Sequence, residues 1–216
     1  MKFAGWQKVS LVDYQEKITT TVFTSGCNFD CAYCHNAKLK KVIDNNITEN
    51  EIFEYIRNHI AMIDALTVTG GEPTIWGEEL ISFFRRYKYN FGHKLLKIDT
   101  NGSKPDFLSK INDLVDYVAI DLKSLDYSLF SDITLDVIKE SLEIVKTFNN
   151  YEIRVTAYPP YVKKEDFLSY KELLKGHKRV AIQQLTPVDH VKPYKKSVLD
   201  EFAKTIEPVV DDVIVK

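Results

Sequence analysis

Short apolar runs alternate along the chain with longer amphipathic stretches. The short runs are rich in β-branched and large apolar residues and predict strands; they cover Ile18–Thr24, Ala65–Thr69, Lys94–Asp99, Tyr117–Asp121, Tyr151–Ala157 and Arg179–Leu185. The amphipathic stretches predict helices over Glu49–Ala61, Glu78–Lys88, Pro105–Leu114, Leu135–Phe148, Lys164–Leu174 and Ser197–Ile206. A capping box, Thr48-Glu49-Asn50-Glu51, marks where the first helix begins.

Regular alternation of strands and helices predicts a parallel sheet with right-handed crossovers. Six units are too few to close the usual eight-stranded barrel. We therefore predict an α/β fold, a partial (β/α)6 TIM-like barrel open on one side, with residues 1–216 forming a single domain. An open doubly wound sheet is the alternative, and periodicity alone does not separate the two. The apolar segment from Phe202 to Val215 fits either a last helix and strand or a partner contact.

Charge and composition restrict the function classes. The 216 residues carry 29 Lys+Arg and 31 Asp+Glu, a net charge of −2, which gives no reason to expect a nucleic-acid or membrane-surface partner. A hydrophobic fraction of 44% excludes disorder throughout. No apolar run approaches the roughly 18 residues of a membrane span, and the N-terminal stretch has no apolar signal core. We expect a cytoplasmic protein whose thiols stay reduced.

Three cysteines, Cys27, Cys31 and Cys34, fall within eight residues and are followed by His35. An odd number of cysteines in a reducing compartment is a poor disulfide framework. Soft thiolates gathered in this way typically bind a metal ion or a cluster.

Four kinds of site compete for these thiols. Attachment of c-type haem, by the C-x-x-C-H pattern of Cys31 to His35, follows export and leaves Cys27 unused. A zinc site needs the adjacent Cys34 and His35 on one tetrahedral ion, and a thioredoxin-like pair again leaves Cys27 unused. A four-iron cluster held by three thiolates uses all of them and leaves one iron open. Because an open iron can bind a substrate or cofactor, this pattern favours chemistry at the cluster over storage of electrons.

A glycine pair and an acid follow the second predicted strand at its carboxyl end, the edge where parallel α/β proteins build their sites. Gly70-Gly71 lets the backbone approach a ligand, or it only makes a tight turn. Glu72 places a carboxylate at the mouth of the strand, where it can hold an ammonium group or remain a solvated acid.

Later strands bring further polar residues to the same edge. Asp121 and Lys123 share one face of an extended segment, so they can hold a zwitterionic ligand or pair with each other. Thr100-Asn101-Gly102 can bind a ribose or form a turn. His190 lies just past the sixth strand, and no role is assigned to it. The convergence of these motifs predicts one composite site.

The motifs together resemble a known family. Cys27-x3-Cys31-x2-Cys34, with Tyr33 before the last cysteine, is similar to the signature of the radical S-adenosylmethionine (SAM) enzymes, and Gly70-Gly71-Glu72-Pro73 is similar to their second motif. The stretches Cys31 to Asn36, Asp99 to Gly102 and Asp121 to Lys123 resemble activases of glycyl radical enzymes. The stretches Gln7 to Tyr14 and Phe23 to Phe29 resemble activating proteins of anaerobic ribonucleoside-triphosphate reductase. The resemblance is strong over about residues 5–125 and weaker beyond.

The resemblance implies roles for individual residues. The three cysteines would ligate one 4Fe–4S cluster, and SAM would chelate its open iron. The implied SAM contacts are Gly70, Gly71 and Glu72 at the amino end, Asp121 and Lys123 at the carboxylate end, and Tyr33, His35 and Asn101 along the adenosine. A reduced cluster would cleave SAM to methionine and a 5′-deoxyadenosyl radical, which would take hydrogen from a glycine Cα of a partner enzyme, most simply anaerobic ribonucleotide reductase.

Two departures and two alternatives accompany this expectation. Gln15-Glu16 stands where related proteins often carry Pro-Gly, in a loop away from the chemistry. With only three cysteines the chain cannot hold a second thiolate cluster, so an external one-electron donor such as a flavodoxin or ferredoxin is expected. One alternative is a radical SAM enzyme acting on a small molecule, similar to carboxy-deazaguanine synthases. The other is a non-catalytic iron–sulfur carrier, which would leave Glu72, Asp121 and Lys123 without a role.

Overall fold

The computed structural model describes residues 1–188 and 191–216 of the chain. Within those residues eight strands form one sheet, and their order across the sheet follows the sequence. The strands are β1 (Phe3–Ser10), β2 (Thr19–Thr24), β3 (Ala65–Gly70), β4 (Leu95–Thr100), β5 (Tyr117–Asp121), β6 (Tyr151–Thr156), β7 (Arg179–Gln183) and β8 (Asp212–Val215). The helices between them are α1 (Glu49–Asn58), α2 (Gly77–Phe91), α3 (Pro105–Ile111), α4 (Leu135–Val145), α5 (Phe167–Leu173) and α6 (Lys196–Ile206).

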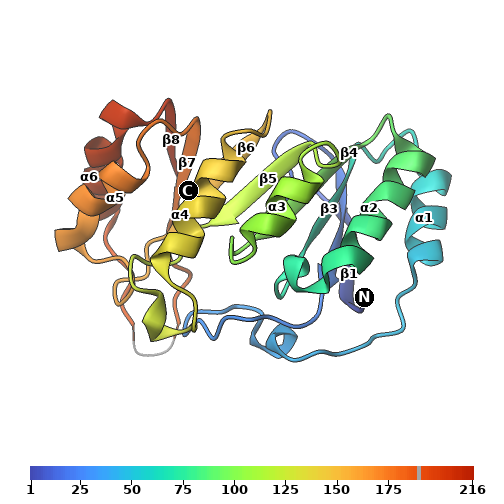
Figure 1. The fold of residues 1–216 in the computed structure, drawn as a ribbon, viewed down its shortest axis with the longest axis horizontal. Coiled ribbons are helices and arrows are strands. Elements are labelled where there is room, and N and C mark those ends of the chain that lie inside the picture. The colour runs from blue at the N-terminus through green and yellow to red at the C-terminus, as the bar shows by residue number, and fades with distance from the viewer. Residues whose placement is uncertain (189–190) are drawn as a thin grey trace.

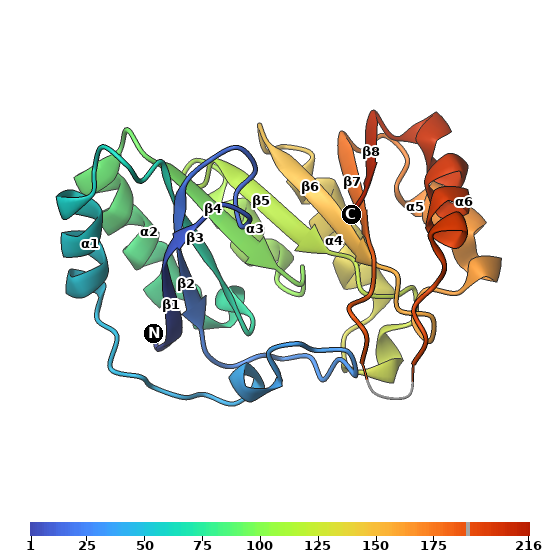
Figure 2. The same ribbon diagram turned by 180° about the vertical axis from the view of Figure 1, so that it is seen from behind.

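The strand order decides between the two predicted architectures. From β2 to β8 every neighbouring pair is parallel, and the order never reverses. Right-handed crossovers in one direction place the helices on a single face of the sheet, whereas a doubly wound sheet needs a reversal that puts helices on both faces. Figure 1 shows the helices in front of the sheet, and Figure 2 shows the face that they leave open. The partial barrel is confirmed, and the doubly wound alternative is wrong.

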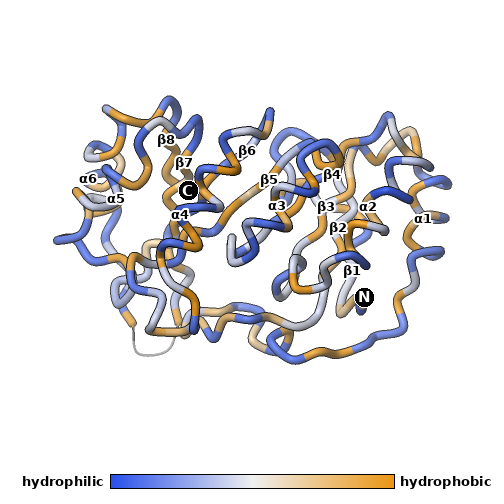
Figure 3. Tube along the Cα trace, in the orientation of Figure 1, coloured by the Kyte–Doolittle hydropathy of each residue, from blue (hydrophilic) through white to orange (hydrophobic). Residues whose placement is uncertain are grey.

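Alternation along the strands separates a helix-facing side from a lumen side. Leu66 and Val68 on β3 lie beside Leu96 and Ile98 on β4, and all four are fully buried. Toward the carboxyl ends of the strands the alternate positions are polar, with threonines on β3 and Lys97 and Asp99 on β4; Figure 3 shows the change between apolar and polar positions along the chain. Parallel strands that are covered on both faces are usually apolar throughout. The polar face therefore indicates a lumen that is built to hold something other than apolar side chains.

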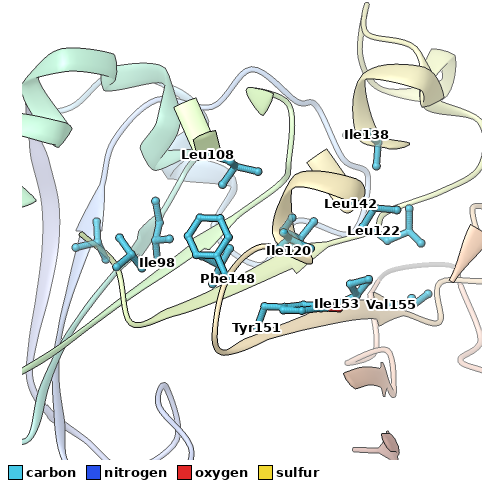
Figure 4. Close-up of a cluster of buried hydrophobic side chains, with 14 of the residues drawn as sticks. Ile98, Leu108, Ile120, Leu122, Ile138, Leu142, Phe148, Tyr151, Ile153 and Val155 are labelled. Carbon is cyan, nitrogen blue, oxygen red and sulfur yellow. The ribbon is translucent and has the colours of Figure 1, made fainter. Parts of the chain in front are cut away.

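The apolar face packs against the helices in a continuous core. Ile98, Ile120 and Ile153 project from three successive strands toward α3 and α4, where they meet Leu108 and Leu142 (Figure 4). Burial of each such side chain contributes about 1.5–3 kcal/mol to folding. This core fixes the spacing of the strands and hence the positions of the residues at their carboxyl ends.

Several predicted elements are confirmed, one strand was missed and the last segment, which was left open, is settled. The six βα units are present, and the Thr48 capping box forms, with the Glu51 N–H 3.2 Å from Thr48 Oγ1 and the Thr48 N–H 2.8 Å from Glu51 Oε2. A 3-10 turn occupies 164–166, so α5 begins later than predicted. Strand β1 was not predicted because it is a bulged antiparallel edge strand with few β-branched residues. Strand β8 settles the last segment as a helix followed by a strand. No helix in the described ranges is long and apolar enough to span a membrane.

His177 is buried beside the start of β7. The Tyr151 hydroxyl accepts a hydrogen bond from the Lys178 N–H (3.1 Å) and faces His177 Nδ1 at 3.3 Å, while His177 Nε2 has no partner among the described residues. Burial lowers the pKa of His177 from 6.5 to about 4, with Lys146 adding to the effect. The imidazole is therefore neutral in the folded protein.

This histidine predicts a loss of stability in acid. Between pH 6.5 and about 4 the unfolded chain binds a proton that the folded chain does not, so the stabilisation present above pH 6.5 is lost as the pH falls. We expect the free energy of unfolding to drop by about 3 kcal/mol over this range because of His177. Urea unfolding at several pH values measures it. His177→Asn, which retains an acceptor for Tyr151, should show a flatter profile; an unchanged profile would contradict this assignment.

Candidate functional site

A cavity of about 460 Å³ opens at the carboxyl edge of the sheet. Its size lies within the usual range for small-molecule sites. The ends of β3 to β7 and the segment that follows β2 line it, and every candidate residue from the sequence contributes to its wall. These residues are Cys27, Cys31, Tyr33, Cys34, His35, Gly70, Gly71, Glu72, Asn101, Asp121 and Lys123. The predicted composite site is thus a single cavity.

The three cysteines lie on a long connection between β2 and α1, residues 25–48, which we call the cysteine loop. Figure 2 shows this loop running along the carboxyl edge toward the last strands and then returning to α1. Phe29 anchors it, since its ring packs edge-on against Tyr127 and Phe130 with centroids 5.7 and 5.5 Å apart. The Asp30 N–H also donates to the Phe130 carbonyl (2.9 Å).

Tyr33 forms a second anchor for the cysteine loop. Its ring centroid lies 4.9 Å from that of Tyr158 and 5.6 Å from that of Tyr161, and the Ala32 N–H donates to the Tyr161 hydroxyl (3.1 Å). The Tyr33 hydroxyl is buried and has no hydrogen-bond partner in the described part of the chain. A buried hydroxyl without a partner is costly, so the packing of the Tyr33 ring has to offset this cost.

The thiols are free, and Cys31 is the most buried of them. Burial raises the pKa of Cys27, and it raises the pKa of Cys31 to about 11. Neighbouring thiols of the same loop add to both shifts, which reflects their closeness. These two groups are protonated in the metal-free protein, so metal ligation would release their protons.

Gly70 and Gly71 are required by the chain itself. A Cβ on Gly70 would lie 2.4 Å from the Thr24 backbone, and Gly70 has φ +123. A Cβ on Gly71 would lie 2.1 Å from the Gly26 carbonyl oxygen, and the Glu72 N–H donates to that same oxygen at 2.8 Å. The glycine pair lets the cysteine loop pack directly on the end of β3. The sequence offered two reasons for the glycine pair, the approach of a ligand and a tight turn. The structure gives a third reason, which is the close contact between the Gly71 and Gly26 backbones.

Glu72 is buried rather than solvated. Its Oε1 accepts hydrogen bonds from the Thr100 hydroxyl (2.6 Å) and from the hydroxyl and N–H of Thr74 (2.6 and 3.1 Å), and its Oε2 accepts from the Asn101 N–H (2.6 Å). Burial raises the pKa of Glu72, and these hydrogen bonds oppose the rise. The carboxylate joins the ends of β3 and β4 at the cavity wall, and all of its donors are neutral.

Asn101 ties the cysteine loop to the end of β4. Its side-chain amide donates to Asn28 Oδ1 (3.0 Å) and accepts from the Ser103 N–H (2.9 Å). Both polar atoms of the Asn101 side chain are thus used within the chain, although the residue lines the cavity.

Asp121 and Lys123 pair with each other inside the cavity wall, with Lys123 Nζ 2.9 Å from Asp121 Oδ2. Burial acts to raise the pKa of Asp121, but the positive charges of Arg154 and Lys123 outweigh it and hold that pKa well below its usual range. Burial likewise acts to lower the pKa of Lys123, and Asp121 outweighs it and raises that pKa. Both groups are therefore charged at neutral pH.

Sequence reasoning missed Arg154 and gave Asp99 no role of its own. Both residues line the cavity. Arg154 donates hydrogen bonds to Asp121 and to Asp99. A signal was present, because Glu152 and Arg154 are charged residues inside a strand of a parallel sheet, where apolar residues are expected. His35 lines the cavity from an exposed position. His190 lies outside the described residues.

A fold with one-sided helices and a thiol-lined cavity at the strand ends defines a class of cofactor-dependent α/β enzyme, and comparison with known proteins agrees. Residues 21–179 match the model of the radical SAM superfamily. A candidate glycyl-radical enzyme activating enzyme, MJ1227 of Methanocaldococcus jannaschii, is 32% identical over 99% of this chain and 95% of its own length. This chain therefore belongs to the radical SAM superfamily, whose enzymes use a 4Fe–4S cluster and SAM.

Other similarities are partial or concern the fold alone. A 7-carboxy-7-deazaguanine synthase of Methanothermobacter thermautotrophicus is 30% identical over 50% of this chain and 42% of its own length. The structure of TYW1 with a lysine-pyruvate adduct has a TM-score of 0.62 at 14% identity, covering 88% of this chain and 73% of that one. The structure of anSMEcpe with bound AdoMet has a TM-score of 0.59 at 17% identity, covering 86% and 58%. Both structural likenesses concern the partial barrel.

The contact at Gly71 gives a prediction for the cysteine loop. In Gly71→Ala the new methyl group would meet the Gly26 backbone, so the loop has to move. We expect a loss of stability of at least about 2 kcal/mol, together with loss of iron bound after anaerobic reconstitution. Gly5→Ala is the control, because its Cβ would make ordinary contacts at 3.5 Å with Phe23. Wild-type stability and iron content in Gly71→Ala would contradict the close packing.

Proposed function

We propose that this protein is a radical SAM activase that generates a glycyl radical on a partner enzyme. The observation that carries the proposal is the meeting, in one cavity, of three free thiols with the Gly70–Glu72 turn and the Asp121–Lys123 pair. The relative MJ1227, which matches nearly the whole chain, supports the activase assignment over other radical SAM functions.

In this proposal Cys27, Cys31 and Cys34 hold a single 4Fe–4S cluster. The donor set fits, because soft thiolates are the ligands that iron–sulfur clusters prefer, and three of them leave one iron open. The chain has only these three cysteines, so the electron comes from an external one-electron donor, for which a flavodoxin or ferredoxin is suitable. The free thiols also support the expectation of a cytoplasmic enzyme.

The cavity also fits SAM. The Gly70–Glu72 turn presents backbone and a buried carboxylate for the amino end, and the Lys123 ammonium can receive the carboxylate end. Tyr33, His35 and Asn101 are the candidates for the adenosine, because all three line the cavity. When bound, the cluster and SAM together supply the one-electron chemistry that abstracts a hydrogen atom. The protein binds and orients these groups and keeps water away from them.

The wall formed by the last strands supports a peptide as substrate. Thr156, Gln183, Gln184 and Thr186 line this part of the cavity with hydroxyl and amide groups. Such groups match the donors and acceptors of a polypeptide backbone and supply no charge. We propose anaerobic ribonucleotide reductase as the glycyl radical partner, on the likeness of the N-terminal stretches to its activating proteins.

A second candidate is a radical SAM enzyme that acts on a small molecule. The similarity to two 7-carboxy-7-deazaguanine synthases, of Methanothermobacter thermautotrophicus and Thermococcus kodakarensis, favours it. The positive charge of Lys216, which also lines the cavity, is the feature that an anionic small substrate would use.

The cofactor assignment predicts a dependence on each cysteine. We expect the anaerobically reconstituted, dithionite-reduced protein to form 5′-deoxyadenosine from SAM, as measured by mass spectrometry. Changing any one of Cys27, Cys31 or Cys34 to Ala should abolish both the product and the bound iron and sulfide, because two thiolates do not retain the cluster. Full iron and sulfide content in any of these variants would overturn the assignment of the substituted cysteine as a ligand.

The partner assignment predicts a radical on a second protein. We expect incubation with anaerobic ribonucleotide reductase, SAM and reductant to give the doublet EPR signal of a glycyl radical. The reductase with its radical glycine changed to Ala is the control and should give none. If the wild-type pair gives no signal while the protein forms 7-carboxy-7-deazaguanine in a parallel assay, the small-molecule candidate replaces the activase.

A further inference from the structure

Arg154 joins two carboxylates that come from two other strands. Its Nε lies 2.6 Å from Asp121 Oδ1, and its Nη1 lies 3.1 Å from Asp99 Oδ2. The sheet register places Arg154 on β6 beside Asp121 on β5, with Ala181 on its other side. Ala119, which pairs with Asp99 on β4, lies on β5, the strand that the guanidinium crosses. Its small side chain leaves room for Arg154 to reach β4.

The contact is the centre of a chain of alternating charges. Lys97 Nζ lies 3.1 Å from Asp99 Oδ1, and at the other end Lys123 Nζ lies 2.9 Å from Asp121 Oδ2. None of these five charged side chains is more than 22% exposed. Three cations and two carboxylates leave one positive charge, and the end at Lys123 faces the cavity. Such a row is stable only while each charge has its partner.

Lys123 depends on Asp121 for its position. A lysine ammonium is a point charge on a flexible stem, so it needs a fixed partner to point in one direction. Asp121 supplies that partner with one oxygen, and Arg154 fixes Asp121 through the other. The Tyr33 ring, whose centroid lies 5.7 Å from Lys123 Nζ, limits the remaining freedom of the ammonium group.

We propose that Arg154 is a positioning residue for ligand binding, which holds Asp121 so that Lys123 presents its charge to an anionic group in the cavity. This inference rests on the proposed function, in which the anionic group is the carboxylate of SAM. The guanidinium is suited to the task because its planar fork contacts two carboxylates at once, which an ammonium group does not match. Arg154 thus acts through Asp121 and Lys123.

The experiment measures ligand affinity without turnover. The wild-type protein and its variants are reconstituted, iron and sulfide are quantified, and the dissociation constants of SAM and decarboxylated SAM are measured on the oxidised cluster by equilibrium dialysis. We expect Arg154→Gln to bind SAM about tenfold more weakly or worse, a loss of about 1.4 kcal/mol. Its affinity for decarboxylated SAM should stay close to that of the wild type, because that ligand lacks the carboxylate. The affinity of Arg154→Lys for SAM should lie between those of the wild type and Arg154→Gln.

Two further variants separate positioning from general damage. Arg179→Gln is the matched control, because Arg179 lies on the neighbouring strand and pairs with Asp212 at 2.7 Å but does not line the cavity; it should bind SAM as the wild type does. Arg154→Gln combined with Asp99→Asn restores the net charge of the row, because it leaves two cations and one carboxylate. The affinity of this double variant for SAM should stay low, because Asp121 still lacks the guanidinium that fixes it.

The outcomes distinguish this inference from the proposed function. If the reconstituted wild type does not bind SAM, the proposed function fails and this inference fails with it. If the wild type binds SAM, three results would overturn only the role of Arg154. These are an unchanged SAM affinity in Arg154→Gln, an equal loss of affinity for both ligands, and recovery of SAM affinity in the double variant.

Discussion

The polar face of the parallel strands is the constraint on which the rest of the structure depends. One face of each strand packs its apolar side chains under the helices, and the strand register then places every second residue on the lumen side. Asp99, Asp121 and Arg154 share that side, although they are separated by up to 55 positions in the sequence. A shift of one residue in any of these strands would turn its charged residue into the apolar core. Core packing and site geometry are thus fixed by the same register.

The cysteine loop depends on two sets of contacts. Close to β2 it packs on Gly71, where no side chain fits between the two backbones. Farther along, Phe29 and Tyr33 insert into aromatic residues that follow β5 and β6. The loop therefore bridges the carboxyl edge of the partial barrel, and its three cysteines line the cavity. A loop held in this way is positioned by the protein itself, which lowers the entropy cost of binding any ligand to it.

Glu72 illustrates how one motif can serve structure and ligand together. Its four hydrogen bonds come from neutral groups, and they join the turn after β3 to the end of β4. No cationic side chain contacts this carboxyl group among the described residues, and burial raises its pKa. A cationic ligand group would provide the missing countercharge, whereas in the Asp121–Lys123 pair the protein supplies its own.

The sequence by itself determined the order of elements, the one cavity-forming edge and the family. Local periodicity and composition carry the strands and helices, and the spacing of Cys27, Cys31 and Cys34 carries the chemistry, because these signals are local in the chain. The partial barrel over the doubly wound sheet, the edge strands β1 and β8, and the reach of Arg154 to Asp99 were decided only by the tertiary structure. Each of them depends on which strands lie side by side, and pairing between distant segments leaves no period in the sequence. The charged Glu152 and Arg154 inside a strand of a parallel sheet were a local trace of that arrangement, and the partners of Arg154 became visible only when the strands came together.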